Sequence, residues 1–287
     1  MKNRQRCQVA LITGSIRGIG LEIASSFAQK GLRLVLTYYD WLDDLEGMRR
    51  KMDQAGADYR AVSVDLRRRD HAEKAVKTAI EEFGRIDILV NNIERGGWPV
   101  VHGQYTPEQW ELEFHTTVTA KWHLFNAALP FLKRNRGATV INITSISGMI
   151  GRTGPAGLVF NDCYSLSNRA MGLLTEQWAR MGAPEVRVNE LVLGFFETRH
   201  GPGTRGWDIL TREQREDILE HTLLRRMGRL EDIVKAVDFL VFDASFVTGT
   251  RLILDGGYSL GGEKVPPMPK GVVTPGESTF GGSKRPE

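Results

Sequence analysis

The chain has 287 residues, of which 41% are hydrophobic and 25% are charged, so it can bury one large core. Its formal net charge is only +3 and the basic residues are scattered among acids, which argues against a nucleic-acid partner. No apolar run reaches the ~18 residues that span a bilayer, and the run at 9–12 is too short for the core of a signal peptide. We therefore expect a cytoplasmic protein with no membrane contact.

Short β-branched apolar runs alternate with longer stretches of helical periodicity along most of the chain. This alternation is typical of βαβ units and of a parallel sheet. Strands are predicted at 9–13, 34–37, 59–64, 86–91, 139–144, 186–193 and 251–254. Helices are predicted at 20–30, 42–55, 71–83, 108–133, 164–181 and 230–242. The expected fold class is α/β, a Rossmann fold with a doubly wound, seven-stranded parallel sheet and helices on both faces.

The end of the chain differs in composition from the rest. Residues 1–260 contain every predicted strand and helix, and no linker divides them, so we expect one Rossmann domain there. Residues 261–287 are rich in Gly, Pro, Ser and Lys and show little periodicity. Such a tail is expected either to be mobile or to pack on a neighbouring subunit.

The first predicted strand is followed by a glycine-rich turn with the sequence Thr13-Gly14-Ser15-Ile16-Arg17-Gly18-Ile19-Gly20. A turn of this kind lets backbone N–H groups and a helix N-terminus approach a pyrophosphate. Because it lies between a predicted strand and a predicted helix, it indicates a dinucleotide-binding site and not merely a structural turn.

Further motifs follow the glycine turn in order. They are Asp65-Leu66, Asn91-Asn92, Ser145 at a strand end, Tyr164, Arg187-Val188-Asn189, the segment 194–198, Val247-Thr248-Gly249 and Asp255-Gly256-Gly257. Together with the TGxxxGxG spacing of the turn, this series resembles the short-chain dehydrogenase/reductase family over about residues 7–260. The resemblance implies hydride transfer between a nicotinamide dinucleotide and a carbonyl or alcohol group.

The resemblance also implies roles for individual residues. Tyr164 is expected to protonate the substrate oxygen and Ser145 to hold it, with Ser147 as the alternative serine. A homo-oligomer, either a dimer or a tetramer, is implied on the helices at 108–133 and 164–181. The residues implied to bind the cofactor are Gly14, Ser15, Arg17, Gly18, Ile19, Gly20, Tyr38, Asp65, Leu66, Asn91, Asn92, Ile93, Tyr164, Asn168, Gly194 and Thr198.

The choice of cofactor depends on the end of the second predicted strand. An acid there favours NAD, because it binds the free adenosine ribose and repels a 2′-phosphate. Tyr38 occupies this position instead, and Arg17 in the glycine turn offers a positive charge to such a phosphate. Asp40, two residues further on, argues the other way. NADP(H) is therefore favoured over NAD(H).

Two residues of the family's catalytic set are replaced. Asn168 stands where the family has a lysine that lowers the pKa of the tyrosine, and Thr117 stands where it has an asparagine that anchors a water relay. Without that charge, the Tyr164 phenol should stay nearer its ordinary pKa of about 10, and oxidation should suffer more than reduction. Lys121, one helical turn after Thr117, is a candidate for the lost charge, although a lysine of this kind is usually exposed.

A third departure lies after the fourth predicted strand. The family's NNAG motif continues here with Ile93 and Glu94 in place of two small residues, so we expect crowding beside the nicotinamide ribose. Glu94 is expected either to turn to solvent in a re-routed loop, or to act as a substitute acid-base group or as a counter-ion for the substrate.

The family's substrate lid corresponds to residues 198–211 of this sequence. Its candidate substrate residues are Arg199, Arg205 and Trp207, and an arginine pair on a glycine-containing loop suits an anionic group. The six histidines show no metal-ligand spacing, and Cys7 and Cys163 show no CxxC spacing, so neither a metal nor a disulfide is predicted.

The leading interpretation is an oxidoreductase that transfers hydride between NADP(H) and a small carbonyl, imine or alcohol substrate. The replacements at Asn168 and Thr117 leave open a nucleotide-binding sensor or scaffold that has lost hydride transfer. Glu94 leaves open a third class, a non-redox lyase or isomerase on the same fold.

Overall fold

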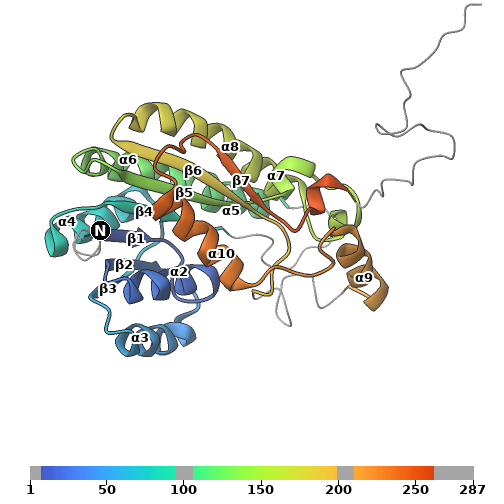
Figure 1. The fold of residues 1–287 in the computed structure, drawn as a ribbon, viewed down its shortest axis with the longest axis horizontal. Helices are drawn as coiled ribbons and strands as arrows, with labels where there is room; N and C mark the ends of the chain where they lie inside the picture. Colours follow the sequence, from blue (N-terminus) through green and yellow to red (C-terminus); the bar gives the residue numbers. More distant parts are fainter. Residues whose placement is uncertain (1–7, 95–105, 199–209, 262–287) are drawn as a thin grey trace, which may run out of the picture.

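The computed structural model describes residues 8–94, 106–198 and 210–261 (Figure 1). Its centre is one parallel sheet with the strand order β3-β2-β1-β4-β5-β6-β7. The expected doubly wound α/β sheet is thus confirmed, and the order reverses between β1 and β4, where such sheets bind ligands. In chain order the strands are β1 (Val9–Ile12), β2 (Arg33–Tyr38), β3 (Tyr59–Ser63), β4 (Ile88–Asn91), β5 (Ala138–Ser145), β6 (Val186–Leu193) and β7 (Arg251–Leu254).

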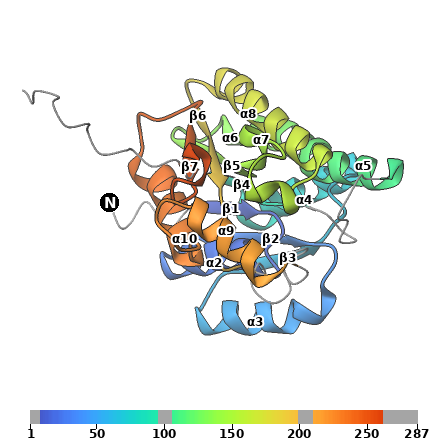
Figure 2. The same ribbon diagram turned by 90° about the vertical axis from the view of Figure 1, so that its right-hand side faces the viewer.

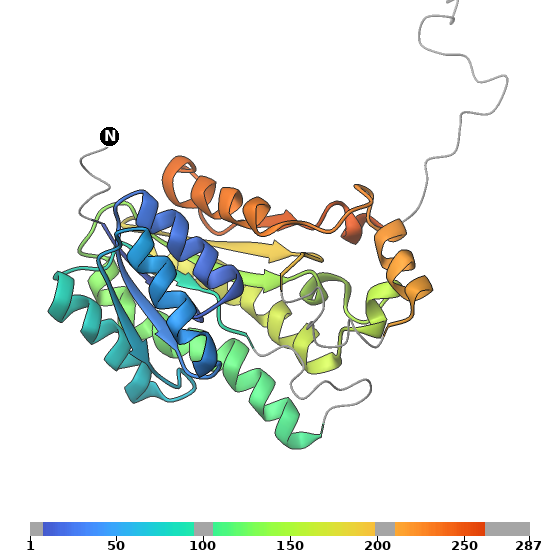
Figure 3. The same cartoon turned by 90° about the horizontal axis from the view of Figure 1, so that it is seen from below.

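Helices cover both faces of the sheet because its central strands are apolar on both sides. In β1, Val9 and Leu11 belong to one core cluster, while Ala10 and Ile12 belong to the other. Figure 2 shows α8 and α3 on opposite sides of the sheet, and Figure 3 shows β6, in gold, between α10 in orange and α8 in yellow-green. The first cluster is covered by α4 (Arg69–Phe83), α6 (Ala120–Leu132) and α8 (Asp162–Gly182), and the second by α2 (Gly18–Gln29), α3 (Leu45–Gln54) and α10 (Leu230–Asp238).

Most predicted elements are confirmed to within a few residues, and the predictions for β6 and β7 match at both ends. Several short elements carry too few turns to show a periodicity in the sequence and were not predicted. These are the 3₁₀ turn η1 (Leu42–Asp44) that begins the predicted helix 42–55, α7 (Ser147–Ile150), and the 3₁₀ turns η3 (Pro155–Leu158) and η5 (Tyr258–Leu260). The longer helix α9 (Arg212–His221) was also not predicted, because Ile218 and Leu219 are its only apolar residues.

The prediction of one regular helix at 108–133 is wrong in its middle. The chain forms α5 (Pro107–Phe114), then a π-helical turn η2 (His115–Thr119), and only then α6. The hydroxyl of Thr116 donates to the backbone oxygen of Leu112 at 2.7 Å, and side chains that bond one turn back in this way disturb the regular ladder. A second π turn, η4 (Phe239–Asp243), likewise replaces the end of the helix predicted at 230–242.

Of the tail predicted at 261–287, only Gly261 is among the described residues. Within the described ranges, no helix combines the length and the apolar content needed to cross a membrane.

Candidate functional site

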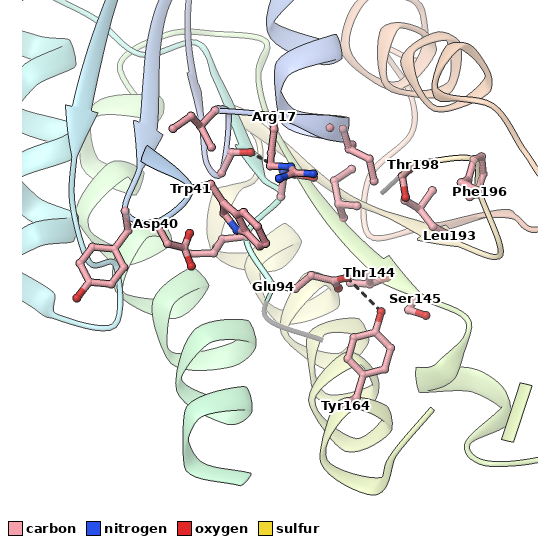
Figure 4. A pocket seen from close by; sticks show the side chains of 18 of the residues that line it. Arg17, Asp40, Trp41, Glu94, Thr144, Ser145, Tyr164, Leu193, Phe196 and Thr198 are labelled. Carbon is pink, nitrogen blue, oxygen red and sulfur yellow. Dashed lines mark hydrogen bonds between the residues drawn. The ribbon is translucent and has the colours of Figure 1, made fainter. Parts of the chain in front are cut away.

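A large pocket opens at the carboxyl ends of the parallel strands (Figure 4). Gly14, Tyr38, Asn92, Ser145 and Leu193 line it, and they stand at or just after the ends of β1, β2, β4, β5 and β6. The predicted site residues among its lining are Gly14, Arg17, Gly18, Ile19, Tyr38, Leu66, Asn92, Ile93, Glu94, Ser145, Tyr164, Gly194 and Thr198. The other described predicted residues, Ser15, Gly20, Asp65, Asn91, Thr117 and Asn168, are not among its lining residues. Arg199, Arg205 and Trp207 lie outside the described residues.

The glycine turn has the geometry that a pyrophosphate needs. Gly14 and Gly18 have φ angles of +60° and +55°, which side chains other than glycine rarely adopt. A Cβ at Gly20 would lie 2.4 Å from the backbone oxygen of Gly14, so the turn packs too tightly for alanine. Arg17 is the N-cap of α2 and makes no side-chain cap, which leaves the first N–H groups of the helix available to an anion.

The two asparagines after β4 have different tasks. Asn92 holds the glycine turn in place, since its Nδ2 donates to the backbone oxygens of Thr13 at 3.1 Å and Gly14 at 3.2 Å. Asn91 is fully buried, and its Nδ2 donates to Oδ1 of Asn142 in β5 at 2.8 Å. Asn92 therefore lines the pocket, whereas Asn91 connects two strands of the sheet.

Asp65 faces an arginine of its own loop. Its carboxylate pairs with Arg67 at 2.6 Å, and its backbone N–H donates to Nδ1 of His71 at 2.9 Å. Burial raises the pKa of Asp65, but the hydrogen bonds from Arg67 outweigh it and hold the pKa below the ordinary value. Leu66, and not Asp65, is the residue of this pair that lines the pocket.

Arg17, Asp40 and Trp41 line the pocket beyond β2, and Arg17 also reaches Asp44, which is not a lining residue. Nη1 of Arg17 pairs with Asp44 at 2.9 Å, and the guanidinium lies 4.5 Å from the ring centroid of Trp41. Figure 4 shows Arg17 beside Trp41, with Asp40 on the same wall. Trp41 has a φ of +62°, so the chain turns sharply there and brings Asp44 within reach. Sequence reasoning missed Trp41 and Asp44, since neither belongs to a motif.

Tyr164 and Glu94 meet in the pocket. Oη of Tyr164 donates to Oε1 of Glu94 at 3.2 Å, so the expectation that Glu94 turns to solvent does not describe this structure (Figure 4). Asn161, the N-cap of α8, accepts the backbone N–H of Tyr164 at 2.9 Å and fixes the first turn of the helix. Burial and then the Glu94 charge raise the pKa of Tyr164 well above 10, and a hydrogen bond with Ser145 opposes them only in part.

Ser145 is the last residue of β5 and lines the pocket beside Tyr164. Its Oγ accepts the backbone N–H of Ser147 at 3.2 Å. Ser147 is buried at the start of α7 and is not among the described lining residues, so the placement favours Ser145 over this alternative.

Asn168 and Thr117 are buried and satisfied by protein groups. Oδ1 of Asn168 accepts the backbone N–H of Ser145 at 2.9 Å, and its Nδ2 donates to the backbone oxygen of Tyr164 at 2.9 Å. The hydroxyl of Thr117 donates to Oε1 of Glu113 at 2.6 Å. Both side chains therefore support the site from within the protein.

Lys121 is fully buried, so the expectation of an exposed helical lysine is wrong. Its Nζ donates to the backbone oxygen of Ile143 in β5 at 2.8 Å. Burial lowers the pKa of Lys121 to about 8, and the nearby carboxylates limit the fall.

Aromatic side chains form another part of the wall. The rings of Phe160 and Phe195 stack at a centroid distance of 5.7 Å, and the ring of Tyr164 lies 6.0 Å from that of Phe160. Both phenylalanines line the pocket and stand in loops. Phe195 lies in the motif segment 194–198, but its place in the pocket wall was not predicted, and Phe160 belongs to no motif. Within the described ranges, no group of three His, Cys, Asp or Glu side chains is placed to hold a metal ion.

Known proteins share this architecture. A family model described as enoyl-(acyl carrier protein) reductase matches residues 14–259. The "Granaticin polyketide synthase putative ketoacyl reductase 2" of Streptomyces violaceoruber is 36% identical over 255 residues, which cover 88% of this chain and 96% of that protein. A short-chain dehydrogenase/reductase from Serratia marcescens is 25% identical with a TM-score of 0.76, covering 88% of this chain and 98% of that chain. A blue fluorescent protein from a metagenomic library, solved with NADPH, gives the same identity, TM-score and coverage.

Proposed function

Because this chain belongs to the short-chain dehydrogenase/reductase family and is an NAD(P)-dependent oxidoreductase, we propose that it uses NADP(H) to reduce a small carbonyl or imine compound. In this proposal Tyr164 donates the proton and Ser145 holds the substrate oxygen. The observation that carries it is the placement of these two hydroxyls beside each other in the same pocket as the glycine turn.

The described residues fit a dinucleotide. The backbone of Gly14 and Gly18 and the uncapped start of α2 would hold the pyrophosphate. Val64 and Leu66 offer an apolar wall to a base. When bound, the cofactor supplies the hydride that reduces the substrate carbon.

The raised pKa of Tyr164 keeps the phenol protonated, although it also makes the phenol a weaker acid. Burial and the Glu94 carboxylate both favour the neutral phenol, so the proton is still present at neutral and mildly alkaline pH. Ser145 can donate its hydroxyl to the substrate oxygen as negative charge develops there. Oxidation needs the phenolate before turnover, and we therefore expect the reductive direction to be much faster.

The preference for NADP(H) rests on Arg17 and Tyr38. No acid stands at Tyr38, and the Arg17 guanidinium lines the pocket over Trp41, where an adenosine 2′-phosphate would add a second partner. Asp44 competes with that phosphate for the same cation. The proposed selectivity is therefore positive but reduced by this ion pair.

The substrate is proposed from the wall around Tyr164. Val159, Phe160 and Phe195 are apolar, so a carbonyl group attached to an apolar or aromatic body fits there. The name of the Streptomyces relative makes ketoacyl compounds the first class to try.

A second candidate function rests on the contact between Tyr164 and Glu94. A phenol hydrogen-bonded to a carboxylate is an acid-base pair that also suits a lyase or an isomerase. Product formed without any net change of NADPH would favour this candidate.

The test begins with calorimetric titration of the protein with NADPH, NADP, NADH and NAD, followed by a screen of ketoacyl and aromatic carbonyl compounds by NADPH oxidation. Tyr164→Phe and Ser145→Ala should each lower kcat by about 10² to 10⁴ with cofactor binding retained. Either variant working at the wild-type rate would remove that residue from the mechanism. Absence of binding by all four nucleotides would remove the reductase proposal and favour a scaffold.

We also propose a homo-oligomer, a dimer or a tetramer, on the outer faces of α5, α6 and α8. Trp110, Trp122 and Leu173 expose 40%, 48% and 57% of their surface there, so an interface on these helices would bury large apolar side chains. Light scattering on the purified chain tests this proposal. A cytoplasmic location is likewise a prediction.

A further inference from the structure

A charged side chain lies beside the pocket at a position that the family pattern does not use. Lys121 reaches β5 from α6 and is 0% exposed, with its ammonium on the backbone oxygen of Ile143. Ile143 itself lines the pocket, two residues before Ser145. A buried ammonium is costly unless carboxylates compensate it.

Three carboxylates compensate Lys121, and they come from three elements. Glu94 after β4 has the largest electrostatic effect on the lysine, followed by Glu190 in β6 and Glu113 in α5. Other titratable or charged groups face these carboxylates. The Tyr164 phenol on α8 feels both Glu94 and Glu113, and the Cys163 thiol on the same helix feels Glu113. Arg251 in β7 pairs with Glu190 at 3.2 Å, so Glu190 serves two cations.

The three carboxylates differ in what else they contact. Glu113 accepts the hydroxyl of Thr117 at 2.6 Å, and Glu190 accepts the hydroxyl of Thr144 at 2.7 Å. Glu94 alone among the three lines the pocket, and the hydrogen bond that it accepts comes from the proposed proton donor, Tyr164. Glu94 is therefore the carboxylate through which Lys121 can influence the reacting phenol.

The position at which the family has its lysine cannot supply a positive charge in this chain. Asn168 uses its side chain to join Ser145 to Tyr164 and carries no charge. A positive charge near the phenol must therefore come from another element.

We propose that Glu94 is the proton-shuttling carboxylate for Tyr164, and that Lys121 on α6 supplies the positive charge that the family keeps on the tyrosine helix. This proposal rests on the reductase function proposed above. Glu94 touches the reacting hydroxyl and is a catalytic residue, whereas Lys121 acts through Glu94 and is a positioning residue.

The proton balance is closed by water. During reduction the O–H bond of Tyr164 breaks and its proton goes to the substrate oxygen, while the hydride and its electron pair come from NADPH. Glu94, which is half-buried at the pocket, takes up one solvent proton per turnover and passes it to the phenolate, so that the net reaction consumes one NADPH and one proton. Below pH 8 Lys121 keeps its proton during the turnover, and its charge stabilises the state in which carboxylate and phenolate coexist.

The long-range electrostatic pairing of Lys121 with Glu94 can be tested without any substrate. The pKa of Lys121 is measured by NMR on protein with isotope-labelled lysine, with Lys121→Met to assign the signal. It should titrate near 8, and Glu94→Gln should lower that pKa by removing the strongest compensating charge. Glu111→Gln, which removes an exposed carboxylate of α5, is the matched control and should leave the pKa unchanged. An unchanged pKa in Glu94→Gln overturns the pairing.

Activity then tests the role. Lys121→Met and Glu94→Gln should each lower kcat by about tenfold or more, with KM and the Kd for NADPH nearly unchanged. The double variant should lose about as much kcat as the more impaired of the two single variants, because the two side chains act as one unit. Losses that multiply would show two independent roles and overturn the proposal.

Two further readouts separate a catalytic effect from a folding effect. The wild-type kcat profile is expected to show an inflection near pH 8, and this inflection should be absent in Lys121→Met. Lys121→Arg keeps the charge at all pH values, so it should retain most of kcat and lose the same inflection; a collapse of kcat in a folded Lys121→Arg chain counts against the charge. If the wild type reduces no carbonyl compound, the proposed function fails, while the NMR titration still decides the pairing.

Discussion

The side chain of Asn168 joins Ser145 to Tyr164, because its Oδ1 accepts the backbone N–H of the serine and its Nδ2 donates to the backbone oxygen of the tyrosine, both at 2.9 Å. One amide thus connects the end of β5 to the first turn of α8. A lysine has no acceptor to offer and would bring an ammonium into a position that is 2% exposed. The amide is therefore part of the architecture of this site.

Restoring the family lysine should accordingly damage the protein. Asn168→Lys leaves the Ser145 N–H without its acceptor, which we expect to cost about 1–3 kcal/mol in the free energy of unfolding and to lower kcat. Denaturant unfolding and steady-state reduction measure the two effects. Arg169→Lys, at the exposed neighbouring position, is the control and should change little. A large gain of activity in Asn168→Lys would instead mean that the wild-type site has decayed.

The sheet was predictable because its signals are local. Runs such as 186–193 and 251–254 are rich in β-branched and aliphatic residues, and both strands end in the structure where they were predicted to end. The glycine turn could be predicted equally well, since the positive φ angles at Gly14 and Gly18 require glycine.

The state of the side chains around Tyr164 was not predictable from local sequence. In the sequence Lys121 resembles a surface lysine, but in the structure it is buried, after the π turn η2, with its ammonium on a backbone oxygen of β5. The sequence suggests that Asn168 binds the ribose, but in the structure its side chain accepts the backbone N–H of Ser145. Both depend on contacts between elements more than twenty residues apart, which periodicity does not report.

The ion pair between Arg17 and Asp44 should limit selectivity for NADP(H). Asp44→Asn keeps the shape of the side chain and releases the guanidinium, so the affinity for NADPH should rise by about two- to fivefold while that for NADH stays constant. Calorimetric titration with both nucleotides measures the ratio. Glu46→Gln, which breaks a comparable pair with Arg49 on α3, is the control. An equal gain for NADH would place Arg17 away from the 2′-phosphate.

The hydroxyl of Thr117 should matter for stability and not for substrate binding. Thr117→Val removes the donor that serves the buried carboxylate of Glu113, and we expect a loss of about 1–3 kcal/mol in the free energy of unfolding with KM unchanged. Thr119→Val removes a hydroxyl that faces only His115 at the helix surface and should cost much less. Equal losses in the two variants would contradict a structural role for the Thr117 bond.

Lys121 should make stability depend on pH in a defined window. Its pKa in the folded chain is about 8, below the ordinary value of 10.5, because burial disfavours the charged form. Below pH 8 the lysine is charged in both states and the cost of burying the charge is fully present. Between pH 8 and pH 10.5 the lysine holds its proton in the unfolded chain but not in the folded chain, so the free energy of unfolding rises with pH.

Comparison with Lys121→Met isolates the contribution of Lys121 and of the carboxylates coupled to it, because groups far from Lys121 titrate alike in both proteins. From pH 7 to pH 10 the wild type should gain about 2 to 3 kcal/mol in the free energy of unfolding relative to the variant. Denaturant unfolding at a series of pH values measures the difference. Lys133→Met, at the partly exposed end of α6, should show no such trend, since its charge stays hydrated. A flat difference for Lys121→Met would mean that the ammonium keeps its proton across this range, and the compensation by the surrounding carboxylates would then be stronger than burial.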